Sequence, residues 1–348
     1  MKTRITELFG IKHPIILAGM AYVSTPNLVA TVANAGGLGI LAGQAYNPDE
    51  LRQAIIETRA LTDKPFGVNI LLISPGAIDR VKVAIEQKVP ILNYALGKAT
   101  DIIKAVHEYD GKVIATVAVE RHALRSEQDG ADAITATGNE AAAHGGNIAS
   151  LVLVPRISSL VGVPVIAAGG FCDGKGLAAA LVLGADAISM GSRFAMTKES
   201  PIHEHFKQEI LKATMEDTIY SAKFDGLPGR ALKTRTTEAI VKRKVPLIGA
   251  VTDALRFKRE LQFSTGELIR GIFKMRKAEK ASLIDLARLP VGLSELRRAI
   301  TNGDENGIMM IGQDCGRIED IPTCAEVIEQ VIAEAEEVLA KATEKAQS

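Results

Sequence analysis

Apolar positions along the chain fall into short runs that alternate with longer stretches of helical periodicity. Eight runs predict strands, because each is short, mostly apolar and bounded by glycine, proline or charged residues. They are 14–20, 37–43, 65–72, 89–96, 112–119, 131–138, 163–170 and 185–192. Between them, segments such as 25–36 and 48–61 repeat apolar residues at helical spacing. Pro26 suits a first helical turn and Gly36 suits a C-cap.

This alternation predicts an α/β fold with an all-parallel sheet. Eight strand–helix units are the number that closes a (β/α)8 barrel, and an open doubly wound sheet is the alternative. The chain has 348 residues, about a hundred more than the roughly 250 of a bare barrel. We therefore expect a barrel over 1–213, a mostly helical lid domain over 214–300 inserted after strand eight, and a C-terminal segment over 301–348 that returns to the barrel.

The extra residues carry an uneven charge. Residues 230–280 contain 14 Lys and Arg against 5 Asp and Glu, whereas residues 304–348 contain 11 acidic residues against 3 basic ones. The whole chain has a net charge of zero and no Trp, so a nucleic-acid-binding protein is not indicated. The basic segment suits an acidic macromolecular partner such as a carrier protein, and a solvated helix face is the alternative interpretation.

The sequence gives no sign of export, membrane insertion or metal binding. It starts without an apolar leader segment, and no apolar run approaches the ~18 residues that a spanning helix needs, which predicts a cytoplasmic protein. Cys172, Cys315 and Cys324 are odd in number and lack a zinc-ligand spacing. We expect no disulfide framework and no metal site. The oligomeric state stays open between a monomer and a homodimer.

Two consecutive strand ends between residues 163 and 194 both suit a phosphate. The first strand ends at Gly169 and Gly170 before a DGKG turn, and the second ends at Gly191 and Ser192. Glycine lets backbone N–H groups approach an anion closely, and the N-terminus of a following helix adds the positive end of its dipole. Because the strands are predicted to be parallel neighbours, the two loops together indicate a phosphate site. The alternative is that the glycines only form tight turns.

A barrel of this kind carries its chemistry at the carboxyl ends of its strands, and this position selects among the six histidines. His144 alone lies on a loop that follows a strand, in the segment TGNEAAAHGGN after strand six. An imidazole is able to move a proton near neutral pH, so we predict His144 as the catalytic residue. Glu140 is expected either to orient this histidine or to cap the next helix.

Several segments together resemble the nitronate monooxygenase superfamily, formerly called 2-nitropropane dioxygenases. They are PIILAGM, NAGGLGIL, KPFGVNILL, GNEAAAHGG, PVIAAGGFCDGKGLAAALVLGADAISMGSRF, TKESPIH and IGQDCGRIEDIP. The resemblance covers residues 3–225 and 295–335 approximately, and it implies a TIM barrel that binds FMN and carries a small lid domain. The superfamily also includes NAD(P)H:quinone reductases and flavin-dependent enoyl-acyl-carrier-protein reductases.

The resemblance also implies roles for individual residues. Gly19 and Met20, at the end of strand one, would lie against the isoalloxazine, and Asn69, at the end of strand three, would bind the flavin edge. The glycines and the serine of the two phosphate loops would hold the FMN phosphate. His144 falls on the family's catalytic histidine, and Gln313, in IGQDCG, matches a position near the flavin.

Two departures from the family pattern concern the reaction more than the cofactor. Some relatives place a lysine on strand five close to the flavin, where this chain has Thr116, and the usual AGGH or AGHP at the histidine is AAAHGG here. The resemblance predicts FMN-dependent oxidation of small alkyl nitronates by O2, with His144 positioning or protonating the substrate. The alternatives are NAD(P)H-dependent reduction of an enoyl-acyl-carrier protein or a quinone, and a non-enzymatic barrel that binds a phosphate ligand.

Overall fold

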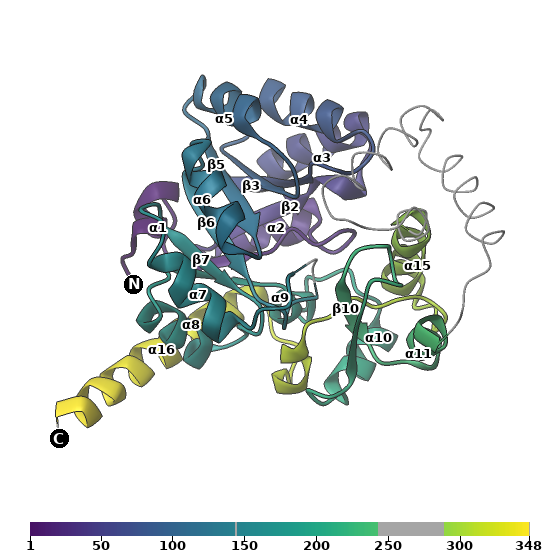
Figure 1. Cartoon of the computed structure of the whole chain (residues 1–348). Coiled ribbons are helices and arrows are strands. Elements are labelled where there is room, and N and C mark those ends of the chain that lie inside the picture. Colours follow the sequence, from purple (N-terminus) through teal and green to yellow (C-terminus); the bar gives the residue numbers. More distant parts are fainter. Residues whose placement is uncertain (143–144, 243–288, 348) are drawn as a thin grey trace.

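Eight parallel strands form a closed barrel. The computed structural model describes residues 1–142, 145–242 and 289–347, and β1 to β8 pair in sequence order, with β8 returning to β1 (Figure 1). The strands are β1 Ile15–Leu17, β2 Leu38–Ala42, β3 Phe66–Leu71, β4 Ile91–Ala95, β5 Lys112–Val117, β6 Ala133–Thr137, β7 Val165–Ala168 and β8 Ala187–Met190. Each lies within one of the eight predicted runs. The predicted barrel is therefore confirmed, and the open sheet is excluded.

Helices cover the outside of the barrel between successive strands. They are α2 Pro26–Asn34, α3 Pro48–Leu61, α4 Ala77–Glu86, α5 Thr100–His107, α6 Glu120–Gln128, α7 Ser150–Ser158 and α8 Gly174–Val182, with the 3-10 turn η1 Gly43–Ala45 after β2. The start of α3 shows how the sequence fixes such a helix. Asn47 and Glu50 exchange side-chain-to-backbone hydrogen bonds in a capping box, and Pro48 occupies the first turn.

The C-terminal helix α16, Cys324–Gln347, fills the last position in the helical layer around the barrel. It packs against α8 and α2, and its far end projects beyond the barrel (Figure 1). Glu334 of α16 accepts a hydrogen bond of 2.7 Å from the backbone N–H of Gly174, the first residue of α8. The helical layer around the barrel is thus completed by the far end of the chain.

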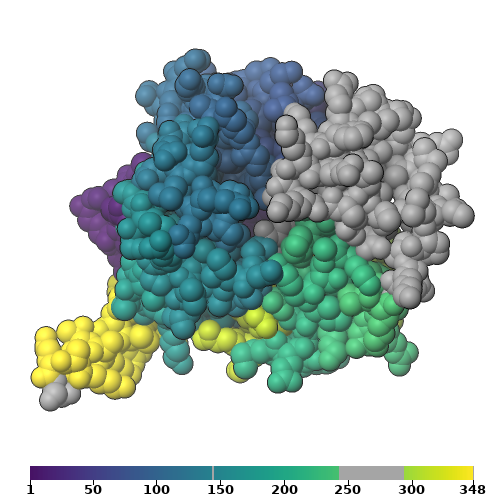
Figure 2. Space-filling view, in the orientation of Figure 1, coloured from purple at the N-terminus to yellow at the C-terminus, as the bar shows by residue number. Residues whose placement is uncertain are grey.

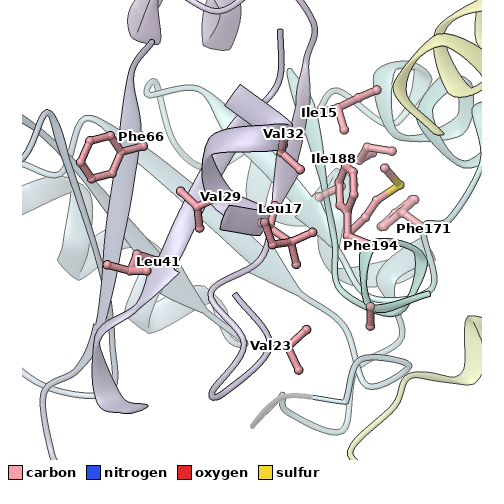
Figure 3. Close-up of a cluster of buried hydrophobic side chains, with 14 of the residues drawn as sticks. Ile15, Leu17, Val23, Val29, Val32, Leu41, Phe66, Phe171, Ile188 and Phe194 are labelled. Atoms are coloured by element: carbon pink, nitrogen blue, oxygen red, sulfur yellow. The ribbon is translucent and has the colours of Figure 1, made fainter. Parts of the chain in front are cut away.

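Two apolar layers hold the barrel together. Side chains that point outward from the strands, such as Leu17 and Ile188, pack in one large cluster with Val29 of α2 and with Phe194 (Figure 3). Side chains that point inward at the amino ends of the strands form a second cluster, which is closed by α1, Arg4–Phe9. Removing this apolar surface from water is the main driving force for forming the barrel.

The inward positions change from apolar to polar toward the carboxyl ends of the strands. Ile91 and Ile114 belong to the inner apolar cluster, whereas Asn93 and Thr116, two residues further along the same strands, are hydrogen-bonded to each other. Residues two apart on a strand point to the same side. One end of the barrel is therefore filled with apolar side chains, and the other end presents polar groups.

The described residues between β8 and α16 form a smaller region beside the barrel. Its elements are α9 Ser192–Ala195, α10 Glu204–Leu211, β9 Thr218–Ser221, β10 Gly229–Leu232, α11 Arg235–Lys242, α15 Leu289–Asn302 and η2 Gln313–Arg317. β9 and β10 form an antiparallel two-stranded sheet. Figure 2 shows the green part of this region packed directly against the barrel. The expected mostly helical region therefore also contains strands, which are too short to give a clear periodic pattern.

The lid boundaries at 214 and 300 stay a prediction. Residues 243–288, which hold most of the basic segment, lie outside the described residues. Arg235 and Lys242, at the two ends of α11, are exposed. Across the helices in the three described ranges, none combines the length and apolarity of a bilayer-spanning segment.

Candidate active site

The carboxyl ends of β7 and β8 place two glycine-containing turns beside each other. β7 continues into Gly169 and Gly170, whose φ angles of +99° and +77° favour glycine, and the neighbouring β8 continues into Gly191 and Ser192. None of these four backbone N–H groups donates a hydrogen bond to an acceptor in the described part of the chain. Unused donors gathered at one edge of the barrel fit a phosphate group.

Two N–H groups at the N-terminus of α8 are already bonded to carboxylates. Asp173 accepts a hydrogen bond of 2.8 Å from the N–H of Gly176, and Glu334 of α16 accepts one of 2.7 Å from the N–H of Gly174. Two of the first-turn N–H groups of this helix therefore already have carboxylate acceptors. The contribution of the α8 dipole to the phosphate site stays a prediction, and the strand-end N–H groups are donors that remain without a partner among the described residues.

The Ser192 hydroxyl makes a contact that the sequence analysis missed. Ser192 donates to Oδ1 of Asp314 at 2.7 Å and accepts a bond of 3.0 Å from the N–H of Gly312. Asp314 is buried, and this burial raises its pKa to about 6. The segment IGQDCG indicated only Gln313 as a site residue. Nothing in the sequence shows that the carboxyl group of the next residue, Asp314, is hydrogen-bonded to the distant Ser192 hydroxyl. Ser192 is thus left with its backbone N–H for a ligand.

The turn after β1 lies close to the end of β3. A Cβ atom on Gly19 would lie 2.5 Å from the Cβ of Asn69, so this approach requires glycine. Asn69 Nδ2 donates to the Gly19 carbonyl oxygen at 3.4 Å. A Cβ atom on Gly191 would lie 3.5 Å from the Sδ of Met20, so the same turn also borders the phosphate loops. The structure thus brings together the residues predicted to contact the ring and those predicted to contact the phosphate.

Asn69 begins a chain of side-chain hydrogen bonds across β3, β4 and β5. Asn93 Nδ2 donates to Asn69 Oδ1 at 3.2 Å, and Thr116 Oγ1 donates to Asn93 Oδ1 at 3.0 Å. Because the Asn69 oxygen is used as an acceptor, the amide group keeps one N–H for a ligand beyond the bond to Gly19. Thr116, at the position where some relatives have a lysine, completes this chain without a charge.

His144 lies outside the described residues, so its catalytic role stays a prediction. The loop between β6 and α7 is described on both sides of it. Glu140 accepts hydrogen bonds of 3.0 and 3.1 Å from the N–H of Ser150 and one of 2.9 Å from its hydroxyl, so it caps α7. The Glu140 carbonyl oxygen accepts a bond of 2.9 Å from the N–H of Gln313. A Cβ atom on Gly170 would lie 3.4 Å from the Glu140 Cβ, so Gln313 also belongs to this edge of the site.

The three cysteines are free and buried. Burial raises the pKa of Cys172 and Cys324 to about 12 and that of Cys315 to about 11. Thiols that stay protonated are poor nucleophiles, so these side chains serve packing. Over residues 1–142, 145–242 and 289–347, no group of three or more His, Cys, Asp and Glu side chains is arranged to hold a metal ion.

Comparison with known proteins identifies the family of the chain. The sequence profile of the nitronate monooxygenase family matches residues 2–334. The chain belongs to this family. Over 341 residues it is 36% identical to the (3aS,4S,5R,7aS)-5-hydroxy-7a-methyl-1-oxo-octahydro-1H-indene-4-carboxyl-CoA dehydrogenase of Mycobacterium tuberculosis, and the match covers 96% of each protein. The structure of FabK from Thermotoga maritima superposes with a TM-score of 0.81 at 39% identity, over 99% of each chain.

A third relative carries the family's own name. The probable nitronate monooxygenase of Staphylococcus aureus is 32% identical, over 68% of this chain and 80% of that protein. The chain is therefore an enzyme, an oxidoreductase of the nitronate monooxygenase family, and the resemblance inferred from its motifs is confirmed. The family is typically flavin-dependent. The roles of the individual site residues stay predictions.

Proposed function

We propose that this enzyme binds one FMN at the carboxyl ends of its strands and moves a hydride between FMN and the acyl chain of a CoA or carrier-protein thioester. The observation that carries the proposal is the set of four unused N–H groups at the ends of β7 and β8. They suit a single terminal phosphate, as FMN has. The chain also does not open on the GxGxxG motif that marks a dinucleotide site.

The choice of a thioester is supported by two relatives that match 96% and 99% of this chain at 36% and 39% identity. One of them is named a carboxyl-CoA dehydrogenase, and the other is FabK. The superfamily that the sequence resembles also includes flavin-dependent enoyl-acyl-carrier-protein reductases, which act on thioesters. A double bond conjugated to a thioester is reduced when a hydride adds to one carbon and a proton adds to the other. The reverse reaction removes both and gives the enoyl thioester.

The chain's own residues would hold the partners of this reaction in place. When bound, FMN would supply the hydride chemistry. The two phosphate loops would hold its phosphate, Gly19 and Met20 would border its ring, and the free N–H of Asn69 would donate to the ring edge. His144 would transfer the proton that accompanies the hydride. The polar mouth of the barrel thus positions the cofactor, and the loop after β6 supplies the proton.

Nitronate oxidation by O2 is the second candidate function. It is favoured by the family profile over residues 2–334 and by the relative from Staphylococcus aureus. Thr116 counts against it, because the position where some relatives have a lysine carries a hydroxyl that donates to Asn93. A hydroxyl attracts an anionic nitronate less than an ammonium group does. The neutral thioester does not need that charge.

Anaerobic mixing of the FMN-loaded enzyme separates the two functions. NADPH or NADH should bleach the flavin absorbance, and a crotonyl thioester of CoA or of acyl-carrier protein should restore it. In the dehydrogenase direction, a saturated acyl thioester alone should bleach it. A flavin that only an alkyl nitronate reduces would establish the second candidate. If the carrier-protein thioester reacts faster than the CoA thioester, and the difference shrinks at high salt, the basic segment has an acidic partner.

A further inference from the structure

The β9–β10 pair contacts the loop that carries the predicted catalytic histidine. Tyr220 of β9 donates its hydroxyl hydrogen to the carbonyl oxygen of Gly145 at 2.9 Å. Arg230 of β10 donates its backbone N–H to the carbonyl oxygen of Ala142 at 3.1 Å. Residues 142 and 145 are the last described positions on either side of His144. The strand pair therefore holds the β6–α7 loop on both sides of that residue.

Tyr220 and Arg230 lie opposite each other in the β9–β10 sheet. They are register partners on the two strands, and the Arg230 guanidinium carbon lies 5.3 Å from the centre of the Tyr220 ring. Arg230 Nη2 donates to the carbonyl oxygen of Asn139 at 2.8 Å, and Nη1 donates to Thr218 Oγ1 at 3.1 Å. The side chain stacks on one partner and bonds to two others, so its geometry is fixed.

Arg230 is buried where the strand pair contacts the loop. The residue is 7% exposed, burial lowers its pKa, and its Nε has no hydrogen-bond partner among the described residues. Burying a guanidinium is costly. The same residue accepts a bond of 3.3 Å at its carbonyl oxygen from the N–H of Ile311, two residues before Gln313. The loop, the strand pair and the segment after them thus form one hydrogen-bonded unit.

We propose that Tyr220 and Arg230 are positioning residues that fix the β6–α7 loop for proton transfer. The proposal rests on the proposed function, in which His144 transfers a proton. The loop contains two consecutive glycines, Gly145 and Gly146, and glycine loses more conformational freedom on ordering than any other residue. Proton transfer requires the donor within hydrogen-bond reach of the reacting atom. The bonds to Asn139, Ala142 and Gly145 restrain the described parts of the loop before and after His144.

Tyr220→Phe in the FMN-loaded enzyme tests the proposal, because it removes one hydroxyl and keeps the ring under Arg230. Amide hydrogen exchange in the peptide 138–149 should rise about fivefold, and kcat should fall about fivefold, as for the loss of one hydrogen bond. The KM should change less than about twofold, because binding contacts are retained. Tyr94→Phe is the matched control. It removes a hydroxyl bonded to Ser126 at 3.0 Å, between the barrel and α6, and should change neither quantity.

Arg230→Lys provides a second variant that keeps the charge and loses the two-pronged contact with Asn139 and Thr218. It should raise exchange in the same peptide. An unchanged exchange rate in both variants would overturn the proposal, and so would raised exchange with an unchanged kcat. If the wild type turns over no thioester, the proposed function fails separately. The exchange rates, with kcat on an alkyl nitronate, then still decide whether the two residues position the loop.

Discussion

Ser192, directly after β8, donates its hydroxyl hydrogen to Asp314 at 2.7 Å, across 122 positions of the chain. The bond joins one of the predicted phosphate turns to the segment that follows the smaller region. Asp314 is 6% exposed, and burial raises its pKa to about 6. The residue that orients Ser192 is therefore a carboxyl group with a raised pKa.

Asp314→Asn should remove part of the pH dependence of stability. The folded-state pKa lies above the ordinary 3.8, so the protonated carboxyl stabilises the fold at low pH, and this contribution is lost as the pH rises through about 6. The amide keeps an acceptor for Ser192 but does not ionise. Urea unfolding of FMN-free protein measures the free energy of unfolding. Between about pH 5 and pH 8 this free energy should fall by roughly 1 kcal/mol more for the wild type than for the variant. Parallel pH profiles would contradict the assignment.

Gly170→Glu should abolish FMN retention. The position has a φ of +77°, and a side chain there would bring a negative charge to the predicted phosphate site. The wild type should purify yellow with one FMN per chain, released by heat, whereas the variant should be colourless. Gly130→Glu is the matched control, because Gly130 has a φ of +101° and lies before β6, at the opposite end of the barrel. Release of FAD from the wild type, or FMN retained by Gly170→Glu, would refute the site.

Thr116→Val should destabilise the barrel mouth through Asn93. The change keeps the side-chain volume but leaves the Asn93 oxygen without its 3.0 Å donor, at a cost of about 1 to 2 kcal/mol in the free energy of unfolding. Thr135→Val, at the paired position on β6, is the control, since no side-chain hydrogen bond of Thr135 is found among the described residues. Urea unfolding of both variants measures the difference. Equal stabilities would mean that the chain of hydrogen bonds from Asn69 has no energetic role.

The barrel and part of its site could be predicted because their signals are local. Each strand lies in a short, mostly apolar run, and Gly169, Gly170, Gly191 and Ser192 directly follow two of the strands. The same local pattern therefore predicts both the strands and the turns. Parallel pairing then places the two turns at one edge without further information.

The missed residues depend on contacts between distant segments. Asp314 meets Ser192 from another part of the chain, and Tyr220 and Arg230 reach a loop about 75 to 91 residues away. Their own neighbourhoods in the sequence carry no motif for these roles. Thr116 is a different case. The sequence shows that it stands where some relatives have a lysine, but it does not predict its hydrogen bond to Asn93. Composition and periodicity do not predict which hydroxyl group forms a hydrogen bond with which distant acceptor.

His144→Ala tests the predicted proton transfer separately from cofactor binding. The variant should retain FMN, because the predicted phosphate contacts come from the ends of β7 and β8. Its kcat should fall by about 10²-fold or more if the imidazole transfers the proton in the transition state. The pH profile of the wild type should show a titration near the imidazole range that is absent in the variant. A smaller loss confined to the KM would mean that His144 only positions the substrate. Full activity of the variant with thioesters, quinones and nitronates alike would reject His144 as the catalytic residue.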